Sequence, residues 1–421
     1  MSERVPDGWA LSALGDFINI GRGFAFKSSD YKGAGVPIIR VTNISDSGTI
    51  SFAGNLVYLD EQEAESYSGF RLIPDDILIV MVGATVGKLA RVSSSIKASL
   101  LNQNMWRLTV KNRKNSSQKF AYHCLKPVVN KFLSSQQGSA RSFLTQKDFS
   151  QAEILLPPFI EQQKIAKILT SVDEVIEKTQ AQIDKLKDLK TGMMQELLTK
   201  GVGVDGKPHT EFKDSPVGRI PKKWDVVTLG DITIDSAFGP RFSSSEYALD
   251  GNIGCIRTTD MDENWDINYA TAPRAKLSNE EFKKHFLEEG DLLVTRSGTC
   301  GLVDVFKQQS LPMIAAAFLI RFRLVATVNP HFVRYLMMSS GIQENIQLLA
   351  SGGVQKNLSG SSLKTLKLPM PDIDEQSKIV NVIESINRRL FTLNRKQIAN
   401  QQLKKALMQD LLTGKVRVTI D

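Results

Sequence analysis

The amino-acid sequence predicts an α+β protein in which two mixed α/β domains are joined by two long helices that form an antiparallel coiled coil, with an internal pseudo-two-fold repeat. The first observation is a duplication: residues 161–165 (EQQKI) return as residues 375–379 (EQSKI), and residues 194–199 (MQELLT) return as residues 408–413 (MQDLLT). Both pairs share an offset of 214, from 375 − 161 and 408 − 194. A constant offset indicates one duplicated unit and not an array of short repeats.

The second observation is that the duplication continues upstream in a looser form. Trp9 followed by LGD at residues 14–16 matches Trp224 followed by LGD at residues 229–231. The sequences of the two globular parts thus diverge, whereas those of the two helical parts remain similar. This difference predicts two domains that bind different targets and are held by the same helical scaffold. We expect globular domains at residues 1–155 and 206–368, and long-helix regions at residues 156–205 and 369–421.

The two helical segments carry apolar side chains at three-four spacing, with charged residues between them. Prolines precede both segments, and Gly201 and Gly414 lie where the helices should stop. One apolar seam cannot stabilise a helix of about 39 residues alone in water, so each helix is expected to pack on the other, although core helices of a bundle are an alternative. The seam residues, also predicted to dock partner subunits, are Ile165, Leu169, Val172, Ile176, Ile183, Leu186, Ile379, Ile383, Ile386, Leu390, Leu403 and Leu407.

Composition favours an intracellular protein. The chain of 421 residues is 42% apolar, enough for two domain cores. Its three cysteines form no CxxC pair, which argues against a disulfide framework or zinc site and for the reducing cytoplasm. The N-terminus lacks an apolar signal core, and the longest apolar run, residues 313–320, is too short to span a membrane. The net charge of +8 is only weak support for nucleic-acid binding, because ordinary basic proteins reach it.

Both globular segments predict mixed strand and helix. Residues 36–41, 77–82, 106–110, 292–295 and 318–324 are strand-like, whereas residues 120–134 and 332–341 are helix-like. Loops rich in Arg, Asn and Gln lie between them, and these side chains fit base edges in the major groove of DNA, although such loops also serve as plain polar surface. The predicted DNA-binding residues are Arg22, Phe24, Lys27, Arg40, Asn43, Lys88, Asn102, Gln103, Asn104, Arg141, Arg241, Arg257, Thr259, Arg296, Ser297, Gln355 and Lys356.

No catalytic constellation stands out in the sequence. Residues 82–89 (VGATVGKL) resemble a phosphate loop only superficially, with three residues between the glycines and Leu89 where Ser or Thr should bind magnesium. Residues 156–159 (LPPF) resemble an amino-methyltransferase signature but have Leu156 in place of its polar residue, and the four histidines have no metal-type spacing. We therefore expect no catalytic residue, no metal and no cofactor in this chain.

Four stretches together resemble the specificity subunit of type I restriction-modification enzymes, over essentially the whole chain. They are GVPIIRVTNI (residues 35–44), LNQN (101–104), LLPPFIEQQKIAKIL (155–169) and LMQDLLTGKVRV (407–418). Residues 254–259 are a weak copy of the first stretch, and residues 368–372 are irregular, which leaves the second globular domain less well defined.

The resemblance implies that each globular domain is a target-recognition domain that binds one half of a split, asymmetric double-stranded DNA sequence, with the long helices acting as a ruler. It also implies two modification subunits, which bind S-adenosylmethionine and methylate adenine, and two restriction/translocase subunits, which use ATP and magnesium. This chain would then be a non-catalytic cytoplasmic subunit without membrane contact. The alternatives are a stand-alone DNA adenine methyltransferase and a coiled-coil adaptor that binds no DNA.

Overall fold

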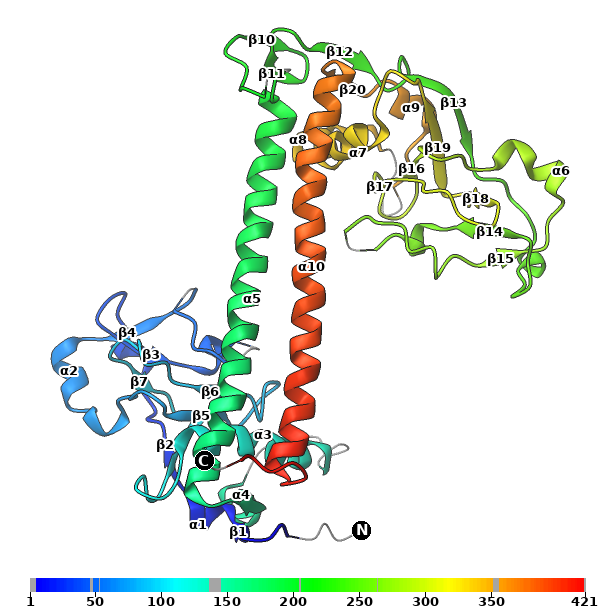
Figure 1. The fold of residues 1–421 in the computed structure, drawn as a ribbon. Helices are drawn as coiled ribbons and strands as arrows, with labels where there is room; N and C mark the ends of the chain where they lie inside the picture. The colour runs from blue at the N-terminus through cyan, green and yellow to red at the C-terminus, as the bar shows by residue number, and fades with distance from the viewer. Residues whose placement is uncertain are drawn as a thin grey trace. The chain divides into compact units, whose positions relative to one another are not determined.

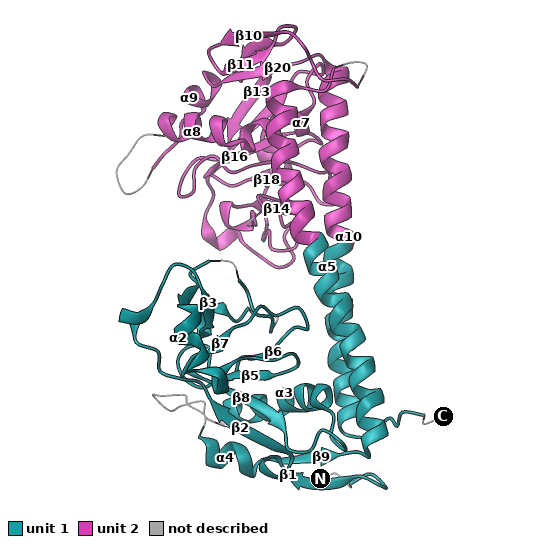
Figure 2. Cartoon of the chain, turned by 90° about the vertical axis from the view of Figure 1, so that its left-hand side faces the viewer, with its two compact units in different colours: residues 1–182, 393–421 teal, residues 183–392 magenta. Residues whose placement is uncertain are grey.

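The structure is a computed structural model that describes residues 5–45, 48–52, 54–135, 145–203, 206–262, 264–350 and 356–419. The chain divides into two compact units, coloured separately in Figure 2. Unit 1 is Met1–Gln182 with Leu393–Asp421, and unit 2 is Ile183–Thr392. Each unit therefore contains one globular domain and part of both long helices.

The globular domain of unit 1 is built on a four-stranded antiparallel sheet in the order β2-β8-β5-β6. A three-stranded sheet, β4-β3-β7, and the pair β1-β9 complete it. The strands are β1 (Ala10–Ala13), β2 (Ile18–Arg22), β3 (Val36–Ile39), β4 (Val57–Leu59), β5 (Ile77–Val80), β6 (Leu89–Arg91), β7 (Leu100–Leu101), β8 (Met105–Val110) and β9 (Glu153–Leu156). The helices are α1 (Leu14–Phe17), α2 (Glu61–Glu65), α3 (Gln118–Ser135) and α4 (Gln146–Gln151), with short 3-10 turns η1 (Ser28–Asp30), η2 (Val41–Asn43) and η3 (Ser68–Phe70).

The core of this domain follows from the alternation of side chains along its central strand, β8. Trp106 lies on one face of the sheet and packs with Phe120 of α3 and with Phe149 of α4, whose ring centroid is 5.8 Å from that of Trp106. Met105 lies on the opposite face and packs with Leu78 of β5 in a second cluster. The sheet is thus covered by apolar side chains on both faces.

The globular domain of unit 2 repeats this construction. Its four-stranded sheet has the order β13-β19-β16-β17, its three-stranded sheet the order β15-β14-β18, and β12 pairs with β20. The strands are β10 (Phe212–Ser215), β11 (Gly218–Pro221), β12 (Asp225–Thr228), β13 (Thr233–Phe238), β14 (Ile253–Ile256), β15 (Arg274–Ala275), β16 (Leu292–Thr295), β17 (Val303–Val305), β18 (Met313–Ala315), β19 (Leu319–Leu324) and β20 (Lys367–Met370). The helices are α6 (Asn279–Phe282), α7 (Pro330–Met338), α8 (Ser340–Leu349) and α9 (Gly360–Lys364), with 3-10 turns η4 (Ser244–Glu246), η5 (Thr258–Asp260) and η6 (Lys283–His285).

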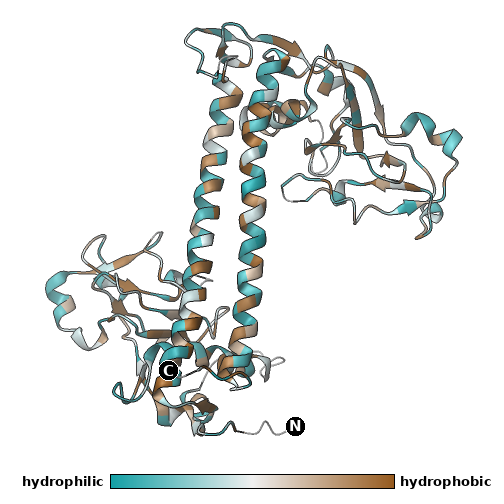
Figure 3. Ribbon diagram, viewed as in Figure 1, coloured by the Kyte–Doolittle hydropathy of each residue, from teal (hydrophilic) through white to brown (hydrophobic). Residues whose placement is uncertain are grey.

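The long helices are α5 (Phe159–Lys200), with 42 residues, and α10 (Ile373–Leu412), with 40 residues (Figure 1). Figure 3 shows hydrophobic residues interspersed with hydrophilic ones along both, as an amphipathic helix requires. Gly201 and Gly414 follow the helix ends with φ of 69° and 70°, a left-handed conformation that favours glycine. The predicted helix stops are therefore confirmed.

Both helices begin in the same way. The Gln162 Nε2 group donates to the Pro157 carbonyl at 2.9 Å, and the Gln376 Nε2 group donates to the Pro371 carbonyl at 2.9 Å. The duplicated Glu-Gln pair therefore fixes the first turn of each helix on the proline segment before it.

The helices run antiparallel, as predicted. In unit 1, Ile165 and Leu169 near the start of α5 share a core with Leu411 near the end of α10. In unit 2, Leu197 near the end of α5 shares a core with Ile379 near the start of α10. The start of each helix is thus paired with the end of the other.

The prediction that Leu403 belongs to the seam is wrong, because its side chain is 50% exposed. The seam positions that follow Leu393 at three-four spacing are instead Gln397, Asn400 and Lys404. Gln397 is 7% exposed, and Asn400 and Lys404 are half-buried. The Gln397 Nε2 group donates to Gln180 Oε1 at 3.3 Å in this polar stretch of the seam.

A polar joint fastens each globular domain to a long helix. In unit 1, His123 Nε2 of α3 lies 3.2 Å from Thr170 Oγ1 and its Nδ1 lies 3.9 Å from Asp173 Oδ2, while Asp173 forms an ion pair with Lys404. In unit 2, the Tyr335 hydroxyl of α7 bonds to Glu384 and accepts from Asn387 Nδ2 at 3.0 Å. Glu384 and Asn387 stand 214 positions after Thr170 and Asp173, so the joint repeats in position while its chemistry differs.

Candidate nucleic-acid interface

Three loops of the first domain meet at one end of its four-stranded sheet. The Gly23 N–H donates to the Met105 carbonyl at 3.2 Å, and the Met81 N–H donates to the Asn104 carbonyl at 3.1 Å. The Asn102 N–H donates to the Ile39 carbonyl at 3.1 Å, which adds the loop after β3. Because β2 and β5 both run antiparallel to β8, their last residues and the first residues of β8 share one end of the sheet.

Glycine is required at the closest approach of these loops. A Cβ atom at Gly23 would lie 1.9 Å from the Asn102 carbonyl oxygen. A Cβ atom at Gly239, in the second domain, would lie 2.2 Å from the carbonyl oxygens of Ala315 and Ala316. Any larger residue would push the two loops apart in either domain.

The second domain joins its loops through the same three backbone bonds. The Gly239 N–H donates to the Leu319 carbonyl at 3.3 Å, and the Arg296 N–H donates to the Phe318 carbonyl at 2.9 Å. The Ala316 N–H donates to the Ile256 carbonyl at 2.7 Å. The bonds define structural equivalence between the domains, with Asn102 matching Ala316 and Asn104 matching Phe318.

The predicted DNA-binding residues of the first domain fall into three groups by exposure. The exposed ones are Arg22, Lys27, Gln103 and Asn104; the half-buried ones are Phe24, Arg40 and Lys88; the buried ones are Asn43 and Asn102. Arg141 lies outside the described residues.

Several of these side chains already have partners within the domain. Asn43 Oδ1 accepts from the Arg40 N–H at 2.9 Å, and Arg40 Nη2 donates to the Asn55 carbonyl at 2.5 Å. Asn43 is 3% exposed, so its side chain faces inward and supports the loop. Among the residues that the structure describes, the Arg22 Nη2 group makes a long 3.4 Å bond to Gln146 Oε1. Gln103 and Asn104 are both exposed in the turn between β7 and β8.

In the second domain, Arg257 is engaged by a carboxylate. Its Nε and Nη2 groups donate to Asp260 at 3.1 and 2.9 Å. Burial raises the pKa of Asp260, but the hydrogen bonds from Arg257 outweigh burial and leave the pKa below its ordinary value. The carboxylate therefore stays ionised and keeps the Arg257 guanidinium beside it.

The remaining predicted residues of the second domain lie near the joined loops or on the exposed turns around them. Arg241, Thr259 and Lys356 are exposed, whereas Arg296 and Ser297 are half-buried. The Arg296 guanidinium carbon lies 4.3 Å from the ring centroid of Phe238, and its Nε group donates to Asn357 Oδ1 at 3.4 Å. Gln355 lies outside the described residues. The assignment of these side chains to DNA contact stays a prediction.

Comparison with known proteins decides the family. The sequence model of the family described as "Type I restriction modification DNA specificity domain" matches residues 6–188 and again residues 221–404, together more than half of the chain. The chain belongs to this family. The two matches also confirm the duplication, and the two globular domains are DNA specificity domains.

Curated relatives agree along nearly the full length. The specificity subunit of the type I restriction enzyme MjaVIII from Methanocaldococcus jannaschii is 28% identical over 426 residues, which cover 99% of this chain and 94% of the relative. The EcoKI specificity subunit of Escherichia coli K12 is 25% identical, with 94% and 86% covered. The crystal structure of the S subunit from M. genitalium shares the fold, with a TM-score of 0.63 at 14% identity, covering 100% of this chain and 98% of that one.

Sequence reasoning missed two exposed aromatic residues beside the interface of the second specificity domain. Phe238 ends β13 and is 45% exposed, and Phe318 precedes β19 and is 55% exposed. The signal lay in the repeat, since an offset of 214 aligns LNQN at residues 101–104 with AAAF at residues 315–318. The polar turn of the first domain thus becomes an apolar turn in the second.

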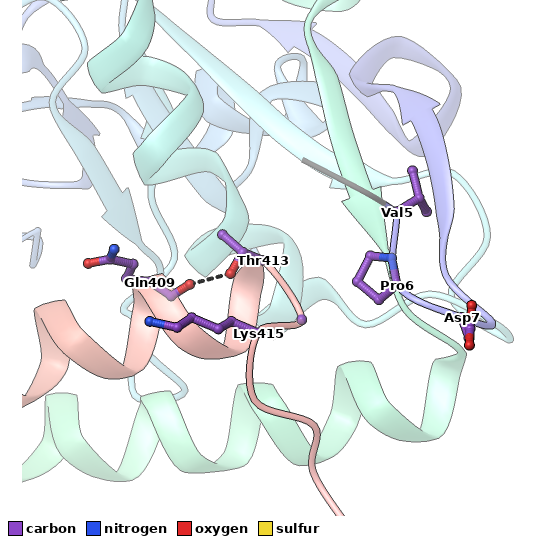
Figure 4. A pocket seen from close by; sticks show the side chains of 7 residues that line it. Val5, Pro6, Asp7, Gln409, Thr413 and Lys415 are labelled. Atoms are coloured by element: carbon purple, nitrogen blue, oxygen red, sulfur yellow. Dashed lines mark hydrogen bonds between the residues drawn. The ribbon is translucent and has the colours of Figure 1, made fainter. Parts of the chain in front are cut away.

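An open depression of about 500 Å³ lies elsewhere in unit 1, between the N-terminal segment and the end of α10 (Figure 4). It is lined by Val5, Pro6, Asp7, Gln409, Thr413, Gly414 and Lys415. None of these is a predicted DNA-binding residue. Among the residues that the structure describes, no group of three or more His, Cys, Asp or Glu side chains comes together as a metal site would require. Within the same described ranges, no helix is long and apolar enough to cross a bilayer.

Proposed function

We propose that this chain is the non-catalytic, DNA-reading subunit of a type I restriction-modification enzyme, and that its two specificity domains each bind one half of a split double-stranded DNA target. The observation that carries the proposal is the repeated loop construction: three equivalent backbone bonds hold different side chains in the two domains. Asn104 in one domain stands where Phe318 stands in the other. Because side chains at base edges determine sequence, the two halves of the target differ and the target is asymmetric.

The long helices dock two modification subunits. Leu189 on α5 and Leu403 on α10 are 214 positions apart, and both are 50% exposed. Each is followed three positions later by a small residue, Gly192 or Ala406. Exposed apolar side chains at matching positions of the two helices suit two copies of one partner, each burying one leucine.

The chemistry of the enzyme belongs to these partners. The modification subunits bind S-adenosylmethionine and methylate adenine, and two restriction/translocase subunits use ATP and magnesium. Neither the phosphate-loop resemblance at residues 82–89 nor the histidine spacing supplies an active site in this chain.

The test is methylome sequencing of cells that carry this chain, its modification subunit, or both. Methylation at one split sequence is expected only when both are present. Replacement of residues 1–150 by the corresponding segment of a relative should change one half of the methylated sequence, while the matched replacement in the second domain should change the other half.

The two alternatives give different results. A stand-alone adenine methyltransferase would transfer methyl groups with the purified chain alone. A protein adaptor would show no salt-dependent DNA binding even with its modification subunit present.

A further inference from the structure

The two specificity domains present opposite chemistry at equivalent positions of their joined loops. The residue before the loop glycine is Arg22 in the first domain and Phe238 in the second, and the residue before the central strand is Asn104 in the first and Phe318 in the second. Hydrogen-bonding groups in one domain are therefore replaced by aromatic rings in the other.

The two phenylalanines lie in neighbouring segments of the second domain. The Arg296 N–H donates to the Phe318 carbonyl at 2.9 Å, while the Arg296 guanidinium lies over the Phe238 ring at 4.3 Å. Phe238 pairs in register with Ile320 of β19, two residues beyond Phe318. Arg296 thus contacts Phe318 through its backbone and Phe238 through its side chain.

Both phenylalanines are exposed in the same part of the second domain. Single exposed apolar residues are ordinary, but two phenylalanines that are 45% and 55% exposed beside one arginine form a patch. Two exposed cations lie in neighbouring segments: Arg241 follows Phe238 by three positions, and Lys356 belongs to the segment that bonds to Arg296 through the Leu358 N–H group. Cations beside an apolar patch complement DNA phosphates.

We propose that Phe318 and Phe238 contact the 5-methyl groups of thymines in the major groove of the half-site bound by the second specificity domain. The proposal rests on the proposed function and assigns two specificity residues to that site. Thymine is the base that presents a methyl group in the major groove, and phenylalanine is among the side chains that contact it. Arg296 stacks on Phe238 and supplies the cation at the same surface. The first domain, with Arg22, Gln103 and Asn104, instead reads hydrogen-bonding edges.

The experiment uses the complex of this chain with its modification subunit. Its ligands are synthetic duplexes that contain the target sequence found by methylome sequencing. Each thymine of the second half-site is replaced in turn by uracil, which removes only the 5-methyl group. One or two of these replacements should weaken binding about three- to fivefold, as expected for one buried methyl group. Uracil in the first half-site serves as the matched control.

The variant Phe318→Ala should bind thymine and uracil duplexes equally at the affected position, whereas Phe318→Leu should retain part of the discrimination. Leu249→Ala is the matched control for loss of an exposed apolar side chain, since Leu249 is 99% exposed in the same domain. Because Phe318 is itself exposed, thermal melting should be unchanged in all three variants.

A second half-site without thymine on either strand overturns the proposal. The proposal is also overturned if the variants Phe318→Ala and Phe238→Ala discriminate between thymine and uracil duplexes as strongly as the unaltered chain does. Absence of sequence-specific binding by the unaltered complex would instead refute the proposed function, which keeps the two failures apart.

Discussion

The Trp224 indole Nε1 group donates a hydrogen bond to Glu375 Oε2 at 3.0 Å, and the Trp9 indole repeats this bond with Glu161 Oε2 at 3.2 Å. Each tryptophan precedes the first strand of its domain's terminal pair, and each glutamate lies in the first turn of a long helix. The bond therefore ties the start of each domain to the start of the helix that follows it.

The same glutamates also accept hydrogen bonds from the segment that follows the C-terminal end of the other long helix. Glu375 Oε1 accepts from the Val202 and Gly203 N–H groups at 2.8 and 3.0 Å and lies 2.9 Å from His209 Nε2. Glu161 pairs with Arg417, which follows α10. One buried carboxylate per unit thus connects a domain, its own helix and the exit of the partner helix.

We predict that Glu375→Gln lowers the free energy of unfolding by about 2–3 kcal/mol, because the amide places a donor against groups that donate and removes the charge that they share. Urea unfolding measures the effect. The matched control is Glu344→Gln, an exposed glutamate in unit 2, which should change the free energy by less than about 0.5 kcal/mol. Equal stability of the two variants would contradict this role for Glu375.

The effect of Glu375→Gln should depend on pH. Burial raises the pKa of Glu375, but the hydrogen bonds from Gly203, Val202, His209 and Trp224 outweigh burial and hold the pKa below its ordinary value of 4.5. A carboxyl group with a lowered pKa in the folded state stabilises the fold above the unfolded pKa and loses this contribution as the pH falls through the folded pKa. The stability difference between the parent and the variant should therefore be full above about pH 4.5 and shrink below it.

A second pH dependence comes from His123. Burial, together with the nearby charges of Lys404 and Arg91, lowers the pKa of His123 to about 3 from an ordinary value of 6.5. At pH values between these two pKa values, His123 is protonated in the unfolded chain but not in the folded chain. The free energy of unfolding therefore falls as the pH drops below 6.5. The expected slope is about 1.4 kcal/mol per pH unit.

Urea unfolding between pH 6.5 and 5 measures that slope above the range in which Glu375 titrates. The variant His123→Gln should reduce it, leaving the smaller contribution of His331, whose pKa burial also lowers, whereas His285→Gln, at a half-buried histidine of the other unit, should leave it in place. An unchanged slope in His123→Gln would show that the pH dependence comes from another titratable group.

Docking of modification subunits provides a prediction with a stoichiometric readout. Leu189→Glu and Leu403→Glu should each remove one modification subunit from the complex, and the double variant should remove both, because each leucine belongs to one of two equivalent helix surfaces. Native mass spectrometry counts the subunits. Leu249→Glu, on the second specificity domain, should leave the count unchanged, and loss of both partners from a single leucine variant would refute two equivalent sites.

Much of the fold could be predicted because its signals are local or repeated. The duplicated EQQKI segment and the glycines after the helices fix the long helices and their limits, and the apolar runs at residues 77–80 and 292–295 fall on central strands. The paired ends of the helices follow from the need to bury one seam on each.

Other features could not be predicted because they depend on tertiary contacts. Leu403 fits the apolar pattern of α10, yet the inward positions are occupied by Gln397 and Asn400. Asn43 and Asn102 have side chains suited to base contact, but the fold buries both. Phe238 and Phe318 look like core residues in the sequence, and only the folded loops show them exposed.

The last prediction concerns base reading by the first specificity domain. Arg22→Ala and Gln103→Ala should each weaken binding by about 1–3 kcal/mol and relax the sequence preference at one position of the first half-site, because each exposed side chain offers a forked set of groups to a base edge. Lys27→Ala is the contrasting variant. An exposed lysine that contacts phosphate should weaken binding to all sequences alike and reduce the slope of log affinity against log salt by about 1. Binding to a panel of duplexes with single base changes, repeated at several salt concentrations, separates the two behaviours. Relaxed preference in the second half-site with Arg22→Ala would show that this loop does not read the first.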